Sequence, residues 1–110
     1  MRLSEVMPGL AGYINENALK FPANLSRVII FGSFAKGTAR VGSDVDIALV
    51  SPETWSFENR SLMREIFENY ECGAKLSLFY TTENGLQSDD KNNANFWIRT
   101  EGKILWSCEK

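Results

Sequence analysis

The chain has no histidine and only two cysteines, Cys72 and Cys108, among its 110 residues. The absence of histidine excludes a Ser-His-Asp triad, a Cys-His pair and an imidazole metal ligand, so any catalysis has to use carboxylates, Lys, Tyr or a metal ion. Two cysteines match neither the spacing of a zinc site nor the disulfide framework of a small secreted domain. We expect both to be reduced thiols that are buried rather than reactive.

Long hydrophobic runs and a secretory leader are missing too. Apolar runs such as Val28–Phe31 are far too short to cross a bilayer, and the N-terminal residues lack an apolar segment followed by a small-residue cleavage site. We therefore expect an intracellular, cytoplasmic protein that does not enter a membrane. With 44% hydrophobic and 24% charged residues, the composition is that of a single globular domain over residues 1–110.

An excess of positive charge is also absent. Twelve Lys and Arg residues stand against fourteen Asp and Glu residues, which gives a formal net charge of −2. A protein that wraps an extended nucleic acid needs a strongly basic surface, so this balance argues against such binding. A local basic patch is still compatible with the composition.

The spacing of apolar residues predicts helices and strands combined in one domain. We predict helices at 2–19 and 61–70, strands at 27–31, 44–50 and 75–81, and a short helix followed by an extended segment at 95–106. The strand at 27–31 is apolar on both faces, which is typical of a central strand covered on both sides. Residues 82–95 are polar, and we expect a mobile loop or a poorly formed helix start there.

The first predicted helix is interrupted by Pro8 and Gly9. Proline inside a helix removes a backbone hydrogen bond, whereas proline in the first turn is well tolerated. Either the helix kinks at Pro8, or Pro8 opens the helix and the residues before it form a separate segment. The sequence leaves both interpretations open.

The most informative pattern is Gly32-Ser33 after one strand and Asp44-x-Asp46 at the start of the next. Residues two apart in a strand point to the same side, about 6.6 Å apart, so these two carboxylates can converge on one cation. Two ionised carboxylates that close repel each other, and a divalent cation keeps both charged. Magnesium fits, because it accepts one or two carboxylates and completes its shell with water and phosphate oxygens.

The residues after the first strand suit a phosphate group. Gly32 lets a ligand approach the backbone without meeting a Cβ atom, and Ser33 adds a hydroxyl and an amide donor. Lys36 can contribute a point charge and Arg40 a second one, although either can equally be an exposed loop residue. Phosphate donors facing a carboxylate pair describe a metal–nucleotide site. Its chemistry would be in-line attack on the α-phosphorus of a nucleoside triphosphate.

Residues 31–50, FGSFAKGTARVGSDVDIALV, resemble the signature of the nucleotidyltransferase superfamily related to DNA polymerase beta, and in size the chain resembles the minimal nucleotidyltransferases. Residues 98–106 resemble the tail of small members more weakly. The resemblance implies an α+β, sandwich-like fold in which helices back a small mixed β-sheet. It also implies transfer of a nucleoside monophosphate from a magnesium-bound triphosphate, for which we expect ATP, to an acceptor hydroxyl. The implied catalytic and metal-binding residues are Asp44 and Asp46, and the implied nucleotide-binding residues are Gly32, Ser33 and Lys36.

The chain departs from the family pattern at a third carboxylate. Active members usually carry one on the following strand, where this sequence has Ser77 at the matching face. A neutral hydroxyl neither bridges two cations well nor acts as a base near neutral pH, so the alternative is a weak or inactive binding module. Glu71 and Glu83 flank that strand and offer only a weak replacement.

A partner is implied as well, because no second domain is available to shape the base and acceptor pockets. The resemblance suggests a helical partner of the HEPN type, with this chain as its antitoxin, and a homo-oligomer is the other arrangement considered. We expect the aromatic residues to serve the core or a subunit contact rather than base stacking. They are Trp55, Phe96, Trp97 and Trp106.

Overall fold

The computed structural model of the chain describes residues 3–71 and 73–108 and contains a four-stranded sheet with strand order β3-β2-β1-β4. The strands are β1 (Arg27–Phe31), β2 (Val45–Ser51), β3 (Leu76–Thr82) and β4 (Lys103–Ser107). Strand β1 runs antiparallel to both β2 and β4, whereas β2 and β3 are parallel. The predicted α+β fold with a small mixed sheet is therefore confirmed.

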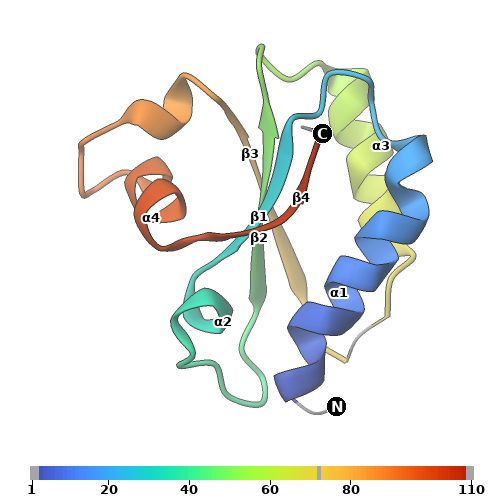
Figure 1. The fold of residues 1–110 in the computed structure, drawn as a ribbon, viewed down its shortest axis with the longest axis vertical. Coiled ribbons are helices and arrows are strands. Elements are labelled where there is room, and N and C mark those ends of the chain that lie inside the picture. Colours follow the sequence, from blue (N-terminus) through green and yellow to red (C-terminus); the bar gives the residue numbers. More distant parts are fainter. Residues whose placement is uncertain (1–2, 72, 109–110) are drawn as a thin grey trace.

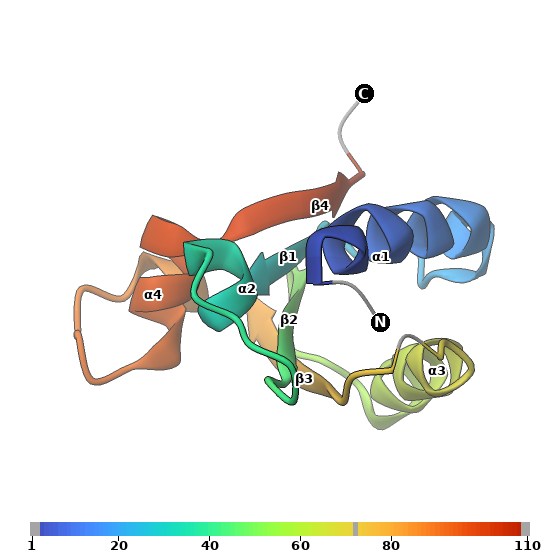
Figure 2. The same ribbon diagram turned by 90° about the horizontal axis from the view of Figure 1, so that it is seen from below.

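Helices lie on both sides of this sheet (Figures 1 and 2). Helices α1 (Leu3–Asn17) and α3 (Phe57–Glu68) cover one face, and α4 (Ala94–Glu101) lies on the other face with the short helix η2 (Gly85–Gln87). The single turn α2 (Ser33–Lys36) follows β1 directly, and η1 (Ala18–Lys20) follows α1.

The two central strands are apolar on both sides because two separate cores use them. In β2, Val45, Ile47 and Leu49 are fully buried in the larger core beneath α1 and α3. The alternate residues Ala48 and Val50 belong to a smaller core beneath α4 and η2. This two-sided burial explains why the sequence of these strands shows no clean alternation of polar and apolar residues.

Helix α1 continues through Pro8 from Leu3 to Asn17, so the interpretation in which Pro8 opens the helix is wrong. Gly9 has a packing role instead. A Cβ atom added there would lie 2.9 Å from the Tyr70 hydroxyl, so a side chain at this position would push the Tyr70 ring away from α1. The Tyr70 ring packs on Tyr13 of α1, with centroids 4.5 Å apart.

Helix α3 begins earlier and ends earlier than the predicted range of 61–70. Ser56 caps it, because its hydroxyl accepts a hydrogen bond from the Asn59 amide at 3.1 Å. The first turn was missed because it carries no apolar face, and Phe57 is 70% exposed. The buried residues of α3 include Met63 as well as Ile66.

The polar segment 82–95 is more structured than predicted. Leu86, in η2, is 1% exposed and belongs to the smaller core. Asn93 caps α4 by accepting a hydrogen bond from the Asn95 amide at 2.9 Å. Of the two expectations for this segment, the structure has short helical elements, η2 and the first residues of α4, rather than an unstructured loop. The burial of Leu86 was missed because one apolar residue in a polar run produces no periodicity.

Several smaller expectations concern exposure. Cys108 is a free thiol but is exposed, so its predicted burial is wrong: it follows the edge strand β4, where little packs over it. The corresponding expectation for Cys72 lies outside the described residues. Trp55 and Trp106 pack partly buried against the larger core, as expected, whereas Trp97 is 41% exposed. Across residues 3–71 and 73–108, no helix has the length and hydrophobicity required to cross a bilayer.

Replacing Leu86 by Ala tests whether the segment 82–95 is part of the folded core. We expect Leu86→Ala to lower the free energy of unfolding by about 2–4 kcal/mol, because it empties a buried leucine site. Gln87→Ala is the matched control at a neighbouring exposed position, and it should cost less than about 0.5 kcal/mol. Urea denaturation measures both values. Equal effects of the two substitutions would contradict the packing described here.

Candidate functional site

Gly32 and Ser33 follow the end of β1, close to the start of β2, and we call these two residues the glycine–serine corner. Gly32 has φ +72° and ψ −150°, a conformation that side-chain-bearing residues rarely adopt. The turn after it is held by a hydrogen bond from the Lys36 amide to the Gly32 carbonyl at 3.1 Å and by one from the Thr38 amide to the Ser33 carbonyl at 3.0 Å.

The absence of a side chain at Gly32 is required by Asp46. A Cβ atom built on Gly32 would lie 2.2 Å from Oδ2 of Asp46, well inside van der Waals contact. The carboxylate of Asp46 therefore rests directly against the backbone of the glycine–serine corner. This contact brings together two motifs that are separated in the sequence by a turn and a loop.

Asp46 is the residue of β2 whose carboxylate faces the glycine–serine corner, and Asp44, just before β2 begins, lies close enough for its charge to act on Asp46. The residue between them, Val45, is fully buried on the opposite side, as is Ile47. Partial burial raises the pKa of Asp46 above its ordinary value, and the negative charge of Asp44 raises it further. The two carboxylates are thus close enough to repel each other, which is a situation that a bound cation relieves.

The sheet register places Ser77 directly beside Asp46. In the parallel pair of β2 and β3, Asp46 is the partner of Ser77, and on its other side Asp46 is the partner of Phe31 in β1. Partners in adjacent strands point to the same face, so Ser77, the position at which the family resemblance implies a third carboxylate, lies on the same face as Asp46. The register agrees with the alternation used to select Ser77 from the sequence.

Glu83 does not replace that carboxylate. Its two carboxylate oxygens accept hydrogen bonds from the Arg27 guanidinium, one of them from Nε at 3.0 Å. Burial alone would raise the pKa of Glu83, but the hydrogen bonds and charge of Arg27 hold it below its ordinary value. Arg27 begins β1, at the opposite end of that strand from Gly32. Glu71 is exposed outside the sheet, before β3 begins.

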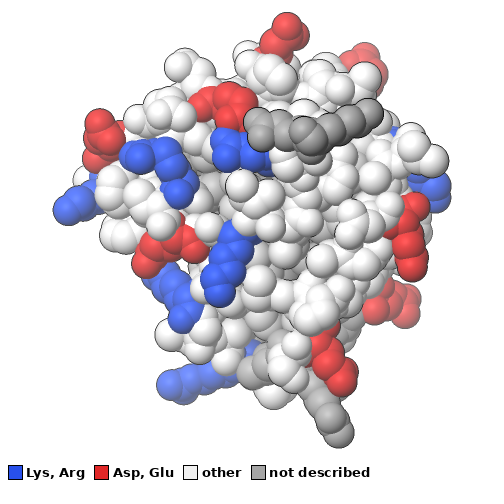
Figure 3. All heavy atoms as spheres, viewed as in Figure 1, with Lys and Arg blue, Asp and Glu red and all other residues white. Residues whose placement is uncertain are grey.

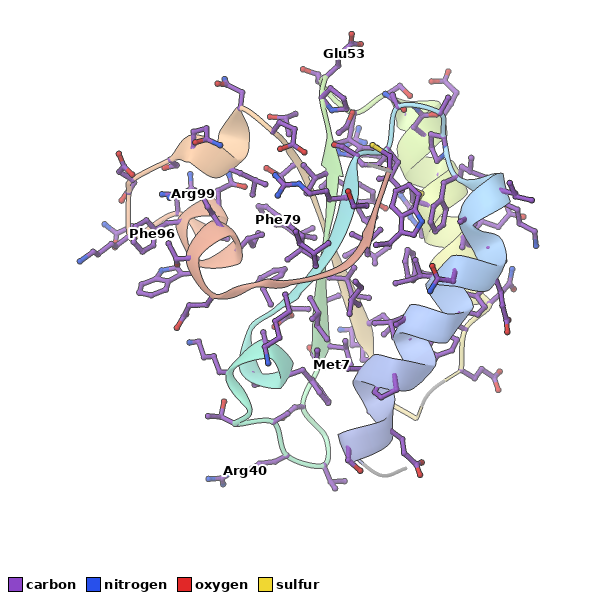
Figure 4. All side chains as sticks on the ribbon, in the orientation of Figure 1. Met7, Arg40, Glu53, Phe79, Phe96 and Arg99 are labelled. Carbon is purple, nitrogen blue, oxygen red and sulfur yellow. The ribbon has the colours of Figure 1, made fainter. Side chains whose placement is uncertain are left out.

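Lys36 and Arg40 occupy different surroundings. The ammonium of Lys36 lies 3.6 Å from Oε1 of Glu101 and 5.8 Å from the centre of the Trp97 ring, so it contacts α4. Arg40 is exposed in the loop between α2 and β2, and its side chain points away from the molecule in Figure 4. Of the predicted cations, Lys36 is therefore the one next to the glycine–serine corner in the chain and in contact with another element.

An aromatic pair that the sequence analysis missed borders the site. Phe31 and Phe79 stand on the strands that flank β2, and their rings meet edge to face with centroids 6.2 Å apart. The small side chain of Ala48, the register partner of Phe79, leaves room for this contact. Both rings are partly buried and pack against the smaller core. The sequence signal that could have found Phe79 is the alternation along β3, which places it on the same face as Ser77.

The donor set near the corner is limited to the carboxylate pair. Within residues 3–71 and 73–108, no group of three or more His, Cys, Asp or Glu side chains is arranged to hold a metal ion. Two carboxylates leave most positions of an octahedral cation to water or to ligand oxygens. A cavity of about 410 Å³ lies on the other face of the sheet, lined by Leu76, Leu78 and Tyr80, and it does not include the corner or the carboxylates.

Comparison with known proteins identifies relatives of this fold. Residues 14–93 match the family model described as a nucleotidyltransferase domain. A candidate nucleotidyltransferase from Sulfolobus solfataricus is similar in structure, with a TM-score of 0.63 and 22% identity over 98% of this chain and 86% of that one. No curated protein matches the chain.

Two further similar structures are toxin–antitoxin complexes. A complex crystallised with AMP-PNP contains a chain with a TM-score of 0.59 and 22% identity, covering 94% of this chain and 74% of that one. A second complex, the tri-AMPylated Shewanella oneidensis HEPN toxin with MNT antitoxin, contains a chain with a TM-score of 0.53 and 17% identity. The match covers 96% of this chain and 73% of that one. At these identities the likeness concerns the fold.

Gly32→Ala tests the contact between Gly32 and Asp46. We expect it to cost about 2–4 kcal/mol of unfolding free energy, because the new methyl group adds a clash to an unfavourable backbone conformation. Gly37→Ala is the matched control: Gly37 also has a positive φ, +77°, but nothing lies within 4 Å of an added Cβ. It should cost about 1 kcal/mol.

Combining each substitution with Asp46→Ala separates the clash from the backbone strain. The double variant Gly32→Ala/Asp46→Ala should recover about 1 kcal/mol or more relative to additivity, whereas Gly37→Ala/Asp46→Ala should be additive. Chemical denaturation of the set provides these values. Additivity in both pairs would show that Asp46 does not rest on Gly32.

Asp46→Asn tests the electrostatic strain at the pair. Because the folded-state pKa of Asp46 is raised, folding binds a proton, and wild-type stability falls as pH rises from the ordinary aspartate value through the raised one. Above that window, in EDTA, the Asn variant should therefore unfold at a higher temperature than wild type. Below it the two should converge. Thermal melts across a range of pH measure the difference in unfolding temperature. An Asn variant that is less stable than wild type at neutral pH would contradict the proposed repulsion between Asp44 and Asp46.

Proposed function

The chain belongs to the nucleotidyltransferase domain family, and from that membership we propose that it binds a magnesium-complexed nucleoside triphosphate and transfers the nucleoside monophosphate to an acceptor hydroxyl. We propose that residues 1–110 form one minimal domain of this kind. The observation that carries the proposal is the approach of the Asp46 carboxylate to the backbone of Gly32. It supports a site at which phosphate oxygens and a carboxylate-bound cation meet.

The residues present fit a magnesium ion. The pKa of Asp46 is raised by burial and by the charge of Asp44, so a cation shared by these carboxylates would relieve a repulsion that folding creates. Asp44 and Asp46 would be its protein ligands, and the remaining ligands would be water and phosphate oxygens. When bound, magnesium supplies positive charge that offsets the charge of the triphosphate.

The chain's own groups would bind and orient the triphosphate. Gly32 leaves room for a phosphate oxygen next to the backbone, and the amide and hydroxyl of Ser33 are donors to such an oxygen. Lys36, one turn later, would add positive charge. ATP is the triphosphate we expect, in keeping with the AMP-PNP bound in one structural relative.

In the reaction, the acceptor oxygen would attack the α-phosphorus and form a new phosphorus–oxygen bond. The bond from the α-phosphorus to the bridging oxygen would break, and pyrophosphate would leave with the electron pair. The hydroxyl proton would pass to water, because Ser77 beside Asp46 does not act as a base near neutral pH. Transfer is therefore expected to be slow compared with an enzyme that has a carboxylate at this position.

A second candidate function rests on the same serine. With Ser77 beside Asp46 and no cluster of three metal-binding side chains in the described part of the chain, the domain would act mainly by binding. It would then be an antitoxin-like subunit that covers a helical HEPN-type partner. The complexes among its structural relatives motivate this choice of partner.

A transfer assay tests the first function. Incubation with α-labelled ATP, magnesium and a HEPN-type partner should label the partner, and Asp44→Asn should reduce the label by about 100-fold or more, because it removes a ligand of the cation. Asp90→Asn, at an exposed position in the segment before α4, is the matched control and should leave labelling unchanged. Equal labelling by wild type and Asp44→Asn would contradict the proposed site.

Ser77→Asp distinguishes the two candidate functions. If the missing carboxylate limits transfer, this substitution should raise the rate at least about tenfold, because it adds a base and a further metal ligand. Ser77→Asn has a similar size without the charge and should give no gain. Partner binding without transfer in wild type and Ser77→Asp alike would favour the binding module.

A further inference from the structure

Lys36 connects the glycine–serine corner to a helix that is distant in the sequence. Its ammonium lies 3.6 Å from the carboxylate of Glu101, the last residue of α4. It also lies 5.8 Å from the centre of the Trp97 ring, one turn earlier in α4. The Lys36 and Glu101 side chains are 49% and 37% exposed, so a bound ligand can reach the pair from solvent.

The backbone at Lys36 is fixed. Its amide donates to the Gly32 carbonyl at 3.1 Å, and Gly37 ends the turn in the left-handed conformation. Lys36 therefore cannot follow a ligand by moving the backbone of α2 without disturbing the glycine–serine corner. Its side chain, which is long and exposed, is the part that is free to change conformation.

The end of α4 is fixed as well. The Gly102 amide donates to the Ile98 carbonyl at 3.0 Å, and a Cβ atom on Gly102 would lie only 2.5 Å from Cγ2 of Ile29 in β1. The junction of α4 and β4 thus packs directly on the sheet. Glu101, just before it, can change its rotamer but not its place beside α2.

The indole of Trp97 is held next to this ion pair. Its Nε1 donates to the Lys91 carbonyl at 2.8 Å, and its ring meets Phe96 edge to face with centroids 5.0 Å apart. A ring fixed in this way, with an ammonium above its face, is a natural reporter of where the Lys36 head group lies.

Without Lys36, the negative charge of Glu101 at the C-terminal end of α4 would be electrostatically unfavourable. The C-terminus of a helix carries partial negative charge, so a carboxylate there is repelled. Figure 3 shows Lys and Arg side chains over the part of the surface where α2 and α4 lie, with acidic side chains among them. The Lys36 ammonium offsets both the carboxylate and the helix end.

We propose that Glu101 competes with the nucleotide phosphates for Lys36, so that the Lys36–Glu101 contact is a latch that is closed in the free protein and opens when the triphosphate binds. This inference rests on the proposed function, because it takes the phosphates to occupy the glycine–serine corner. Glu101 acts on the nucleotide only through Lys36, and Trp97 loses its ammonium neighbour as the latch opens.

The Lys36–Glu101 contact is weak because both side chains are partly exposed to solvent. An exposed ion pair contributes little, and a triphosphate with several negative charges attracts the same ammonium more strongly. The contact therefore lowers nucleotide affinity without preventing binding. Its removal should strengthen binding by about two- to fivefold, which corresponds to the usual strength of such a pair.

Calorimetry with magnesium and an ATP analogue that has a methylene bridge between the α- and β-phosphorus atoms tests the latch. Glu101→Gln should bind the analogue about two- to fivefold more tightly than wild type. Glu53→Gln is the matched control: Glu53 is exposed at the end of the molecule opposite α2 and Arg40, as Figure 4 shows, and losing its charge should leave affinity unchanged.

A double-variant cycle with Lys36→Gln tests whether Glu101 affects nucleotide affinity through Lys36. In the Lys36→Gln background, Glu101→Gln should no longer change affinity, because its effect passes through Lys36. Analogue binding should also shift the Trp97 fluorescence of wild type, read as the difference from Trp97→Phe. That shift should be absent in Lys36→Gln.

The outcomes separate this inference from the proposed function. Measurable binding by wild type with no gain in Glu101→Gln, or an equal gain with and without Lys36, overturns the latch and leaves the nucleotide site standing. Absence of binding in wild type and in every variant overturns the proposed function and the latch with it. A gain that depends on Lys36, together with the Trp97 shift, supports both.

Discussion

The rest of the site depends on the contact between the Asp46 carboxylate and the bare backbone of Gly32. It joins the end of β1 to the start of β2 at a distance that no side chain at position 32 would permit. Because Asp46 is held there, partial burial raises the pKa of its carboxyl, and the charge of Asp44 raises it further. A cation bound by this pair would also stand beside the donors of Ser33. Geometry and electrostatics therefore both support the proposed ligand, a metal-bound phosphate chain.

The parallel pairing of β2 and β3 determines what the site lacks. It sets Ser77 beside Asp46, so the face that presents two carboxylates presents a hydroxyl where a third would stand. Under the proposed function, this arrangement would bind the nucleotide but would offer no carboxylate at position 77 to receive the acceptor proton. Phe31 and Phe79 contact each other on this face and pack against the smaller core.

The strands and the paired motifs were predictable from sequence because their signals are local. Val28–Phe31 is apolar and its first three residues are β-branched, and Asp44-x-Asp46 alternates with buried residues. The start of α3 was missed because its first turn has no apolar face, and Leu86 was missed because a single apolar residue shows no period. The partners of Lys36 were beyond prediction for a different reason. Glu101 is 65 positions away, and only the packing of α4 on the sheet brings the two together.

The most direct test of the account is to locate the cation itself. Crystals grown with manganese and a nonhydrolysable triphosphate would reveal the metal by its anomalous scattering. The account predicts one peak within bonding distance of an oxygen from each of Asp44 and Asp46, with triphosphate oxygens completing the shell next to Gly32 and Ser33. A triphosphate bound elsewhere, or a metal that contacts neither carboxylate, would contradict it.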